Sequence, residues 1–138
     1  MVLGLFGKKR DPNAPRPILV VDDDKDVASF IQDVLLSSGY QAITANDGEK
    51  AVAAAKAENP CLILLDINMP GWSGLRTLTQ LRVEEETRAI PVLMVTAEQM
   101  GRDVEDAFKR GAKGYVIKPV DIPRLLKKVA EIVPRPAS

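Results

Sequence analysis

Short, continuous runs of hydrophobic residues recur along the chain, separated by longer segments in which hydrophobic residues follow a helical spacing. Four runs are clear, at 18–21, 61–65, 91–95 and 114–117, and a weaker one lies at 41–45. Runs without alternation of hydrophobic and polar residues are typical of strands buried on both faces of a parallel sheet. The pattern therefore predicts five strands that belong to one sheet.

Each segment that follows a predicted strand has the pattern of one amphipathic helix. The first helix is marked on one face by Val27, Phe30, Ile31, Val34 and Leu35. We expect that face to cover the sheet. Asp47 is the predicted N-cap of a second helix that ends near Glu58, before the Asn59-Pro60 pair. The other helices are indicated by Leu75, Leu78 and Leu81, by Val104, Ala107 and Phe108, and by Ile122, Leu125, Leu126, Val129 and Ile132.

The regular alternation of strand and helix predicts an α/β fold, a doubly wound five-stranded parallel sheet with helices on both faces and right-handed crossovers. A chain of 138 residues is too short for an eightfold barrel, which needs about 250 residues. Residues 1–17 contain three prolines and no hydrophobic period, so we expect a flexible leader there. The predicted domain covers 18–133, and 134–138 form a short tail.

The composition limits the chemistry and the location of the protein. The sequence has no histidine, which excludes a Ser-His-Asp triad, a zinc site built on imidazole and a phosphohistidine on this chain. Its single cysteine, Cys61, has no partner for an internal disulfide, and we interpret it as an inert core thiol. No run approaches the ~20 apolar residues of a membrane span, so we expect a cytoplasmic protein without stable membrane insertion.

The charge is balanced overall but divided along the chain. Lys and Arg number 19, and so do Asp and Glu. Residues 1–17 carry a net charge of +3, and the remainder carries −3. Such a body does not have the basic surface of a DNA-binding domain. The leader is expected to be a disordered tail, with weak contact to an anionic membrane as the alternative.

Reactive side chains follow four of the five predicted strands. In parallel sheets of this kind, ligands bind outside the carboxyl ends of the strands. At those ends the chain carries Asp22, Asp23 and Asp24, then Asp66, Thr96 and Lys118. A single polar residue after a buried strand usually reflects only a hydrated loop. A whole set of this composition instead predicts a site.

The predicted site has the parts needed for phosphoryl transfer. Two carboxylates about 4 Å apart repel by roughly 4 kcal/mol at an effective dielectric near 20, so the cluster needs a cation. Oxygen ligands favour Mg²⁺, with Mn²⁺ as a substitute. Asp66, at the end of the central strand, is the predicted nucleophile, and Asp22 with Asp23 would hold the metal. Thr96 and Lys118 would contact phosphate oxygens.

Four motifs together resemble a known family. They are Val20-Val-Asp-Asp-Asp24, Leu65-Asp-Ile-Asn-Met-Pro70, Val95-Thr-Ala97 and Gly114-Tyr-Val-Ile-Lys-Pro119. In this order and spacing they resemble the receiver domain of two-component response regulators over residues 18 to about 133. The resemblance implies the flavodoxin-like strand order 2-1-3-4-5. It also implies that the chain is a phospho-accepting signalling protein and not an enzyme acting on other substrates.

The resemblance implies a role for each site residue. Asp66 would accept a phosphoryl group from the phosphohistidine of a histidine kinase or phosphotransfer protein. Asp22, Asp23, Asp66 and the backbone carbonyl of Asn68 would hold Mg²⁺. Thr96 and Lys118 would contact the phosphoryl oxygens, and Tyr115 would swing inward when Thr96 engages them.

Neighbouring positions refine this interpretation. Asn68 and Glu98 occupy the two positions that tune phosphoryl lifetime in the family, and their pairing resembles fast-cycling chemotaxis receivers, so we expect a signal of seconds to minutes. Asp24 is expected to be a solvated charge or a helix cap. Pro119 follows the lysine where receivers usually have a cis peptide.

The sequence also departs from the family pattern. Trp72 and Ser73 stand where a methionine and an acid are common, and Trp72 is interpreted as a surface aromatic. Lys113-Gly114 replaces the acidic pair of DNA-binding regulators, and the length leaves no output domain. We therefore expect a stand-alone receiver without direct DNA binding, which contacts a downstream protein through the face from Glu98 to Pro123.

Three alternatives stay open at this point. An aspartate-nucleophile phosphatase would use Asp22 and Asp24, but the Thr or Val expected two residues further on is Asp26. A flavodoxin-like mononucleotide-binding protein would need a first loop that binds phosphate. Here the loop at 22–26 is acidic and would repel phosphate. A receiver-shaped adaptor that is never phosphorylated is the third.

Overall fold

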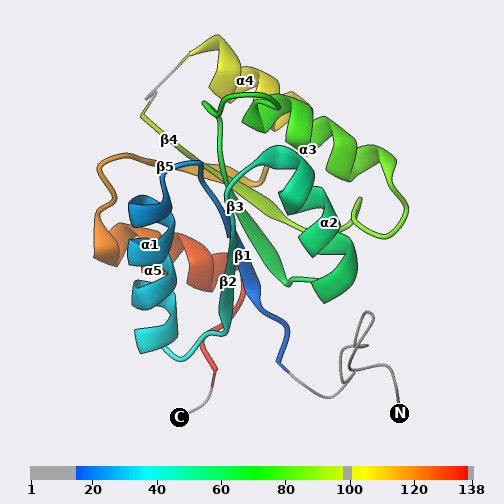
Figure 1. Cartoon of the computed structure of the whole chain (residues 1–138). Helices are drawn as coiled ribbons and strands as arrows, with labels where there is room; N and C mark the ends of the chain where they lie inside the picture. Colours follow the sequence, from blue (N-terminus) through cyan, green and yellow to red (C-terminus); the bar gives the residue numbers. More distant parts are fainter. Residues whose placement is uncertain (1–14, 98–100, 137–138) are drawn as a thin grey trace, which may run out of the picture.

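A computed structural model describes residues 15–97 and 101–136, and strands and helices alternate throughout these ranges (Figure 1). The strands are β1 (Ile18–Val21), β2 (Ala42–Ala45), β3 (Leu62–Asp66), β4 (Val92–Thr96) and β5 (Gly114–Ile117). The helices are α1 (Lys25–Ser37), α2 (Gly48–Glu58), α3 (Gly74–Val83), α4 (Arg102–Lys109) and α5 (Ile122–Ile132). The predicted α/β alternation is confirmed.

The five strands form one parallel sheet in the order β2-β1-β3-β4-β5, which confirms the expected doubly wound fold. The pairing register aligns the carboxyl ends of the central strands. Val21 is opposite Leu65, and Asp66 is opposite Val95. Asp22, which follows β1, and Asp66 and Thr96, which end β3 and β4, are thereby brought to the same edge of the sheet.

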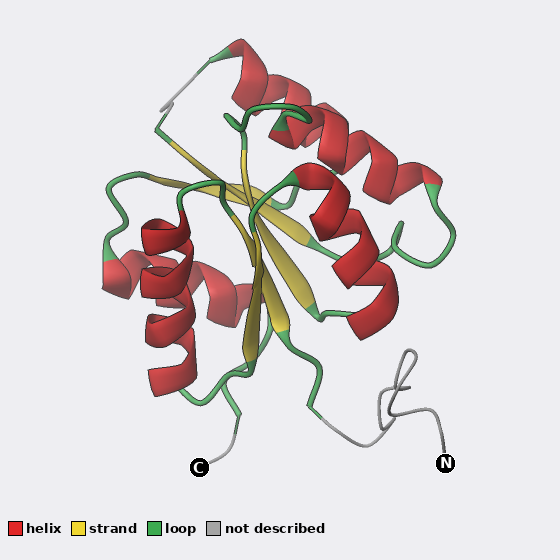
Figure 2. Ribbon diagram, in the orientation of Figure 1, coloured by secondary structure: helices red, strands yellow, loops and turns green. Residues whose placement is uncertain are grey.

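The helices divide into two layers, one on each face of the sheet (Figure 2). α1 and α5 cover one face, and α2, α3 and α4 cover the other (Figure 1). Successive residues of each strand point to opposite layers, so Val20 packs with α1 and α5 whereas Val21 packs with the other three helices. Because both faces are covered, the strands need hydrophobic residues at every position.

Acidic and hydroxyl side chains cap the starts of four helices. Asp47 accepts a hydrogen bond from the backbone N–H of Lys50, as predicted, and Asp24 accepts from Asp26 and Val27. The remaining two caps are Ser73 for α3 and Asp121 for α5. Each cap satisfies backbone N–H groups that have no partner inside the helix.

The helical faces are less buried than their periodicity predicts. Phe30 belongs to the face expected to cover the sheet, but 45% of its surface is exposed, and Phe108 and Ile122, which mark two other helices, are 46% and 39% exposed. Only a narrow line of residues on a helix, such as Ile31 and Leu35 in α1, contacts the sheet. Side chains on either side of that line point partly into solvent. The expectation that this side chain covers the sheet was therefore wrong for Phe30.

The chain is attached to the sheet before β1 begins. Arg16, which the sequence placed in the leader, donates from Nε to the carbonyl oxygen of Asn59 at 2.8 Å and from Nη2 to that of Pro60 at 2.8 Å. The half-buried Cys61 lies just before β3, and its backbone N–H donates to Pro17. The first fourteen residues of the predicted leader lie outside the described residues. No helix in the described ranges is long and apolar enough to cross a membrane.

Two adjacent leucines in α1 provide a test of this packing. Leu35 is fully buried, whereas 44% of Leu36 is exposed. Leu35→Ala should lower the free energy of unfolding by about 2–5 kcal/mol, because it leaves a cavity against the sheet. Leu36→Ala should change it by less than about 1 kcal/mol. Urea denaturation of both variants measures the difference, and equal losses would contradict the assigned face of α1.

Candidate functional site

Three carboxylates meet at the carboxyl ends of β1 and β3. Asp22 and Asp23 follow β1, and Asp66 ends β3, the adjacent strand. One oxygen from each carboxylate lies within 4.8 Å of the others. Asp22 and Asp66 are buried, and Asp23 is exposed to solvent. The structure thus brings together the acidic residues that the sequence predicted.

Lys118 supplies the positive charge of this cluster. Its Nζ lies 2.7 Å from Asp22 Oδ2 and 3.3 Å from Asp66 Oδ2. The backbone N–H of Lys118 donates to the carbonyl oxygen of Thr96 at 2.8 Å, which fixes the start of the β5–α5 loop beside the end of β4. The following Lys118–Pro119 peptide bond is cis, as the motif predicted.

Burial and neighbouring charges shift the pKa values of Asp66 and Lys118. Burial raises the pKa of the Asp66 carboxyl above its usual value, the Lys118 ammonium opposes this shift, and the Asp22 carboxylate adds to it. For Lys118, burial alone would lower the pKa, but the Asp22 and Asp66 carboxylates outweigh that effect and raise it. Lys118 therefore stays cationic, while the cluster keeps an excess of negative charge.

The remaining predicted residues lie around these groups. Thr96 is the last residue of β4 and is fully buried. The backbone N–H of Asn68 donates to Asp66 Oδ1 at 3.3 Å. Tyr115 lies in β5, half-buried, with its ring edge-on to Phe108 at a centroid distance of 6.1 Å. Glu98, the second position predicted to tune lifetime, lies outside the described residues.

Asp24 is separate from the cluster. Its Oδ1 accepts hydrogen bonds from Asp26 and Val27 at 3.0 Å and 3.3 Å, which makes it the cap of α1. Its backbone N–H also donates to Asp22 Oδ1 at 2.9 Å. Of the two expectations for this residue, the helix cap is confirmed. A phosphatase-like use of the Asp24 side chain would require giving up this cap.

Gly74 is a site residue that the sequence analysis did not identify. Its backbone N–H donates to Ile67 at 2.7 Å, and a side-chain carbon added to it would lie only 2.1 Å from the Asp66 carbonyl oxygen. Only glycine allows α3 to begin this close to the phosphoacceptor candidate. A glycine at the start of a predicted helix, just after the loop that follows Asp66, was the available signal.

Trp72 packs between two helices. A side-chain carbon added to Gly48, at the start of α2, would lie 2.7 Å from Trp72 Cβ and 2.3 Å from Thr77 Oγ1. The guanidinium of Arg76 lies over the indole ring, 4.5 Å from its centroid. Trp72 is therefore half-buried, and it packs the loop before α3 against the start of α2.

The carboxylate cluster fits a small divalent cation. Opposite ligands of an octahedral Mg²⁺ lie about 4.2 Å apart, because each metal–oxygen distance is about 2.1 Å. The spread of the three carboxylate oxygens, within 4.8 Å, is close to that value. The buried Asp22 Oδ2 accepts from the Lys118 ammonium at 2.7 Å and has no other partner among the described residues. A carboxylate oxygen has two lone pairs, so one remains to coordinate a metal.

Comparison with known proteins identifies this arrangement. A sequence profile of the response regulator receiver domain matches residues 18–130. The chain belongs to the response regulator receiver family. Members of this family are signalling proteins of two-component systems, and receiver domains bind Mg²⁺ through an acidic cluster such as Asp22, Asp23 and Asp66. The mononucleotide-binding alternative is not supported.

Individual relatives agree with this assignment. The receiver is 34% identical to the polar-differentiation response regulator DivK of Brucella anthropi over 115 residues, which cover 83% of this chain and 94% of the relative. The chemotaxis protein CheY4 of Vibrio cholerae has a TM-score of 0.82 at 29% identity, over 87% of this chain and 100% of the other. A response regulator structure from Chloroflexus aurantiacus has a TM-score of 0.81 at 31% identity, over 88% and 100%.

Substitution of Gly74 tests how the loop positions Asp66. In Gly74→Ala the new methyl group must displace the Asp66 carbonyl, so we expect Mg²⁺ affinity to fall by about tenfold, the usual effect of disturbing a group that orients a ligand. Gly71→Ala is the matched control, because no atom lies within 4 Å of the added carbon. Its positive φ should cost about 1–2 kcal/mol of stability without changing the affinity. Isothermal titration calorimetry measures both, and equal Mg²⁺ affinities would contradict the role of Gly74.

Proposed function

We propose that the protein accepts a phosphoryl group on Asp66 from the phosphohistidine of a partner histidine kinase or phosphotransfer protein, and that residues 18–133 form the unit that does so. The observation that carries this proposal is the placement of the Asp66 carboxylate. It lies at the rigid end of the central strand, within the acidic cluster and 3.3 Å from the Lys118 ammonium.

The reaction is a displacement at phosphorus. A carboxylate oxygen of Asp66 attacks the phosphorus atom of the donor, and the phosphorus–nitrogen bond breaks. The bonding electron pair leaves with the donor imidazole, and an aspartyl phosphate remains on this chain. To end the signal, water attacks the same phosphorus atom, the bond between phosphorus and the Asp66 oxygen breaks, and inorganic phosphate leaves while the free carboxylate is restored. These two steps on its own side chain are the only chemistry that we assign to the protein.

A bound Mg²⁺ neutralises and orients phosphoryl oxygens, and Mn²⁺ is a substitute. Asp22, Asp23, Asp66 and the backbone carbonyl of Asn68 would hold it. The buried Asp22 oxygen and the proximity of the three carboxylates support this ligand set.

Thr96, the last residue of β4, and Lys118, the first residue after β5, are assigned to bind the phosphoryl group. Lys118 would pair with one oxygen of the phosphoryl group, and the hydroxyl of Thr96 would donate to another. The backbone hydrogen bond between these residues supports their acting on one group. Movement of Thr96 toward the phosphoryl group would allow Tyr115 to swing inward and alter the outer surface of β5.

A groove beside the site supports docking of a phosphodonor protein. It has a volume of about 700 Å³ and is lined mainly by apolar side chains of α1 and of the loop after Lys118, among them Phe30 and Val120. The exposed surface of Phe30 is therefore part of this groove. A partner that covers the groove would present its phosphohistidine near Lys118 and exclude water.

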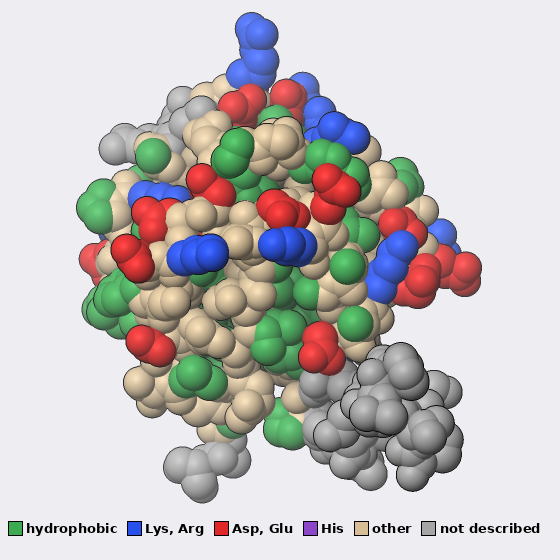
Figure 3. Space-filling view, in the orientation of Figure 1, with side chains coloured by type: hydrophobic (Ala, Val, Ile, Leu, Met, Phe, Trp, Pro, Cys, Tyr) green, Lys and Arg blue, Asp and Glu red, His purple; other side chains and the backbone are tan. Residues whose placement is uncertain are grey.

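The output surface is assigned to α4, β5 and α5, where Phe108 and Tyr115 lie in contact. We assign no direct DNA binding. On the face that carries α1, β2 and α2, acidic and basic side chains are intermixed (Figure 3). A protein partner fits the aromatic contact in the output surface better than a nucleic acid does.

Phosphorylation of the purified chain tests this function. Incubation with Mg²⁺ and acetyl phosphate should add the mass of one phosphoryl group, measured on the intact protein. Asp66→Asn should show no addition, and removal of the metal with EDTA should abolish it in the wild type. Asp24→Asn is the matched control, because asparagine still caps α1 and the cluster keeps its three carboxylates. Uptake by Asp66→Asn, or none by the wild type, would contradict the proposal; turnover of unrelated phosphate esters would instead support a phosphatase.

The lifetime of the phosphoryl group is a separate prediction. The pairing of Asn68 with Glu98 predicts decay over seconds to minutes after the donor is removed. Asn68 is exposed, and its backbone N–H donates to Asp66 Oδ1, so this position adjoins the proposed phosphoacceptor. Mass spectra recorded at intervals in Mg²⁺ measure the decay. A label retained overnight would refute this prediction and leave phosphorylation itself unaffected.

A further inference from the structure

The described part of the chain begins beside the ends of α1 and α5, which lie on the same face of the sheet (Figure 1). Pro15 lines a cavity of about 350 Å³ together with Gly39, which closely follows α1, and Val133, which follows α5. The residues that precede Pro15 in the sequence are therefore attached to the fold at this end of the two helices.

A second cavity starts near this point and continues between the helices. It has a volume of about 310 Å³, and Ser37 and Ser38 line it at the end of α1. Phe30 lines both this cavity and the groove of about 700 Å³ beside Lys118, so the two are continuous. We call them together the α1–α5 groove, which is lined by α1 between Asp26 and Ser38, by Pro119 and Val120, and by Ile122 and Leu126 of α5.

The α1–α5 groove exposes apolar side chains from both helices. Phe30 of α1 is 45% exposed and Ile122 of α5 is 39% exposed. Val34, Val120 and Leu126 are half-buried in the same groove. Apolar surface that is gathered in one place in this way marks a contact site, because leaving it in water is unfavourable.

The charge that this groove presents to solvent is negative. Asp26 and Asp33 lie two helical turns apart on one side of α1, and neither forms an ion pair with another described residue. Lys118 also lines the groove, but its ammonium contacts Asp22 and Asp66. A segment that combines apolar residues with cations would complement this surface.

The sequence of residues 1–10, which lie outside the described residues, has this composition. Residues 1–6 are apolar, and Lys8, Lys9 and Arg10 follow them. Residues 7–14 connect the apolar part to Pro15, and eight extended residues span about 26 Å. With 13 residues, α1 is about 20 Å long. The apolar part can therefore reach the end of the groove that lies beside Lys118.

From these observations we propose that residues 1–10 bind in the α1–α5 groove of their own chain, with the apolar part against Phe30 and Val120 and the cations facing Asp26 and Asp33. A covalently linked segment has an effective concentration on the order of millimolar, so a weak contact is enough to fill the groove. A phosphodonor protein, which the proposed function seats in part of the same groove, must then displace the segment. Only this consequence rests on the proposed function.

Two other arrangements fit less well. A second copy joined by a twofold axis would bring the acidic side of α1 close to itself, which is unfavourable for a self-complementary interface. An anionic membrane would attract Lys8, Lys9 and Arg10, but it would repel the rest of the chain, which carries a net charge of −3. It would also leave the α1–α5 groove uncovered.

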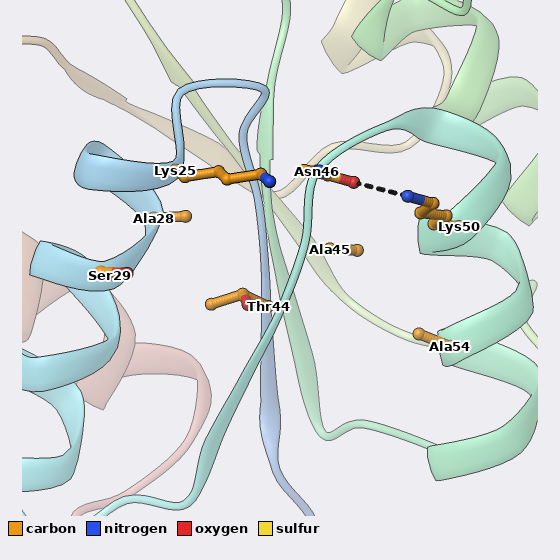
Figure 4. Close-up of a pocket in the computed structure, with 8 residues that line it drawn as sticks. All are labelled: Lys25, Ala28, Ser29, Thr44, Ala45, Asn46, Lys50 and Ala54. Carbon is orange, nitrogen blue, oxygen red and sulfur yellow. Dashed lines mark hydrogen bonds between the residues drawn. The ribbon is translucent and has the colours of Figure 1, made fainter.

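Paramagnetic NMR on the full chain tests the docking. Cys61→Ser removes the single native thiol, and Leu3→Cys carries a nitroxide. We expect the backbone amides of Phe30 and Val120 to lose most of their signal intensity relative to the sample with the reduced label. Lys50 and Ala54 provide the internal control, because they line a separate groove over β2 on the α2 side (Figure 4). Their amide signals should keep their intensity.

A charge reversal at the groove tests the electrostatic part of the contact. Asp33→Lys should weaken docking by about fivefold, because it replaces an attraction with a repulsion, and the groove signals should recover. Glu49→Lys is the matched control, since it makes the same change at an exposed position of α2, outside the α1–α5 groove. It should leave the signal losses unchanged.

The remaining outcomes identify the other occupants. Signal loss in an unlabelled ¹⁵N chain mixed with a nitroxide-labelled ¹⁴N chain would assign the groove to a second copy. Co-sedimentation with phosphatidylserine vesicles, without signal loss in the groove, would assign residues 1–10 to a membrane. Either result would overturn the inference, as would equal effects of Asp33→Lys and Glu49→Lys. None of these measurements uses phosphorylated protein, so a failure of Asp66 to accept phosphate would contradict the proposed function alone.

Discussion

The site depends on negative charge that the fold holds together against its own repulsion. Asp22 and Asp66 are both buried, and Lys118 lies between them as the nearest cation in the described structure. One ammonium does not neutralise three carboxylates, so the cluster favours a further cation and is sensitive to any group that changes the local charge. Transfer of a phosphoryl group to Asp66, as proposed, would be such a change, and the same excess of negative charge would then underlie both metal binding and the response to phosphorylation.

The sheet provides the rigidity that this arrangement needs. β3 is the central strand, buried at every residue, and Asp66 is its last residue. A charged group at the end of a rigid strand cannot relax away from its neighbours as one on a mobile loop would. Gly74 adds to the constraint from the other side, because it lets α3 start directly against the Asp66 backbone. Hydrophobic burial elsewhere in the domain offsets the unfavourable free energy of bringing these charges together.

The order of strands and helices and the acidic cluster could be predicted from the sequence, because both depend on local signals. Hydrophobic runs mark the strands, and parallel strands bring their carboxyl ends to one edge, so Asp22 and Asp66 had to meet. The exposure of Phe30 and Phe108 could not be predicted. The hydrophobic periodicity of a helix shows which face is apolar, but not how much of that face the sheet and the adjacent helices cover. The same holds for Gly74 and Trp72, whose roles depend on close contacts with residues of other segments, and the sequence does not record those distances.

The position of the single tryptophan gives the molecule a built-in optical probe. The indole of Trp72 is half-buried, stacked under the Arg76 guanidinium and packed where α2 meets the loop that leaves Asp66. Its emission arises from one place in the chain, so a spectral change reports on that junction alone. Events at the acidic cluster that shift this loop become visible in real time, without a label and without altering any group that takes part in the chemistry.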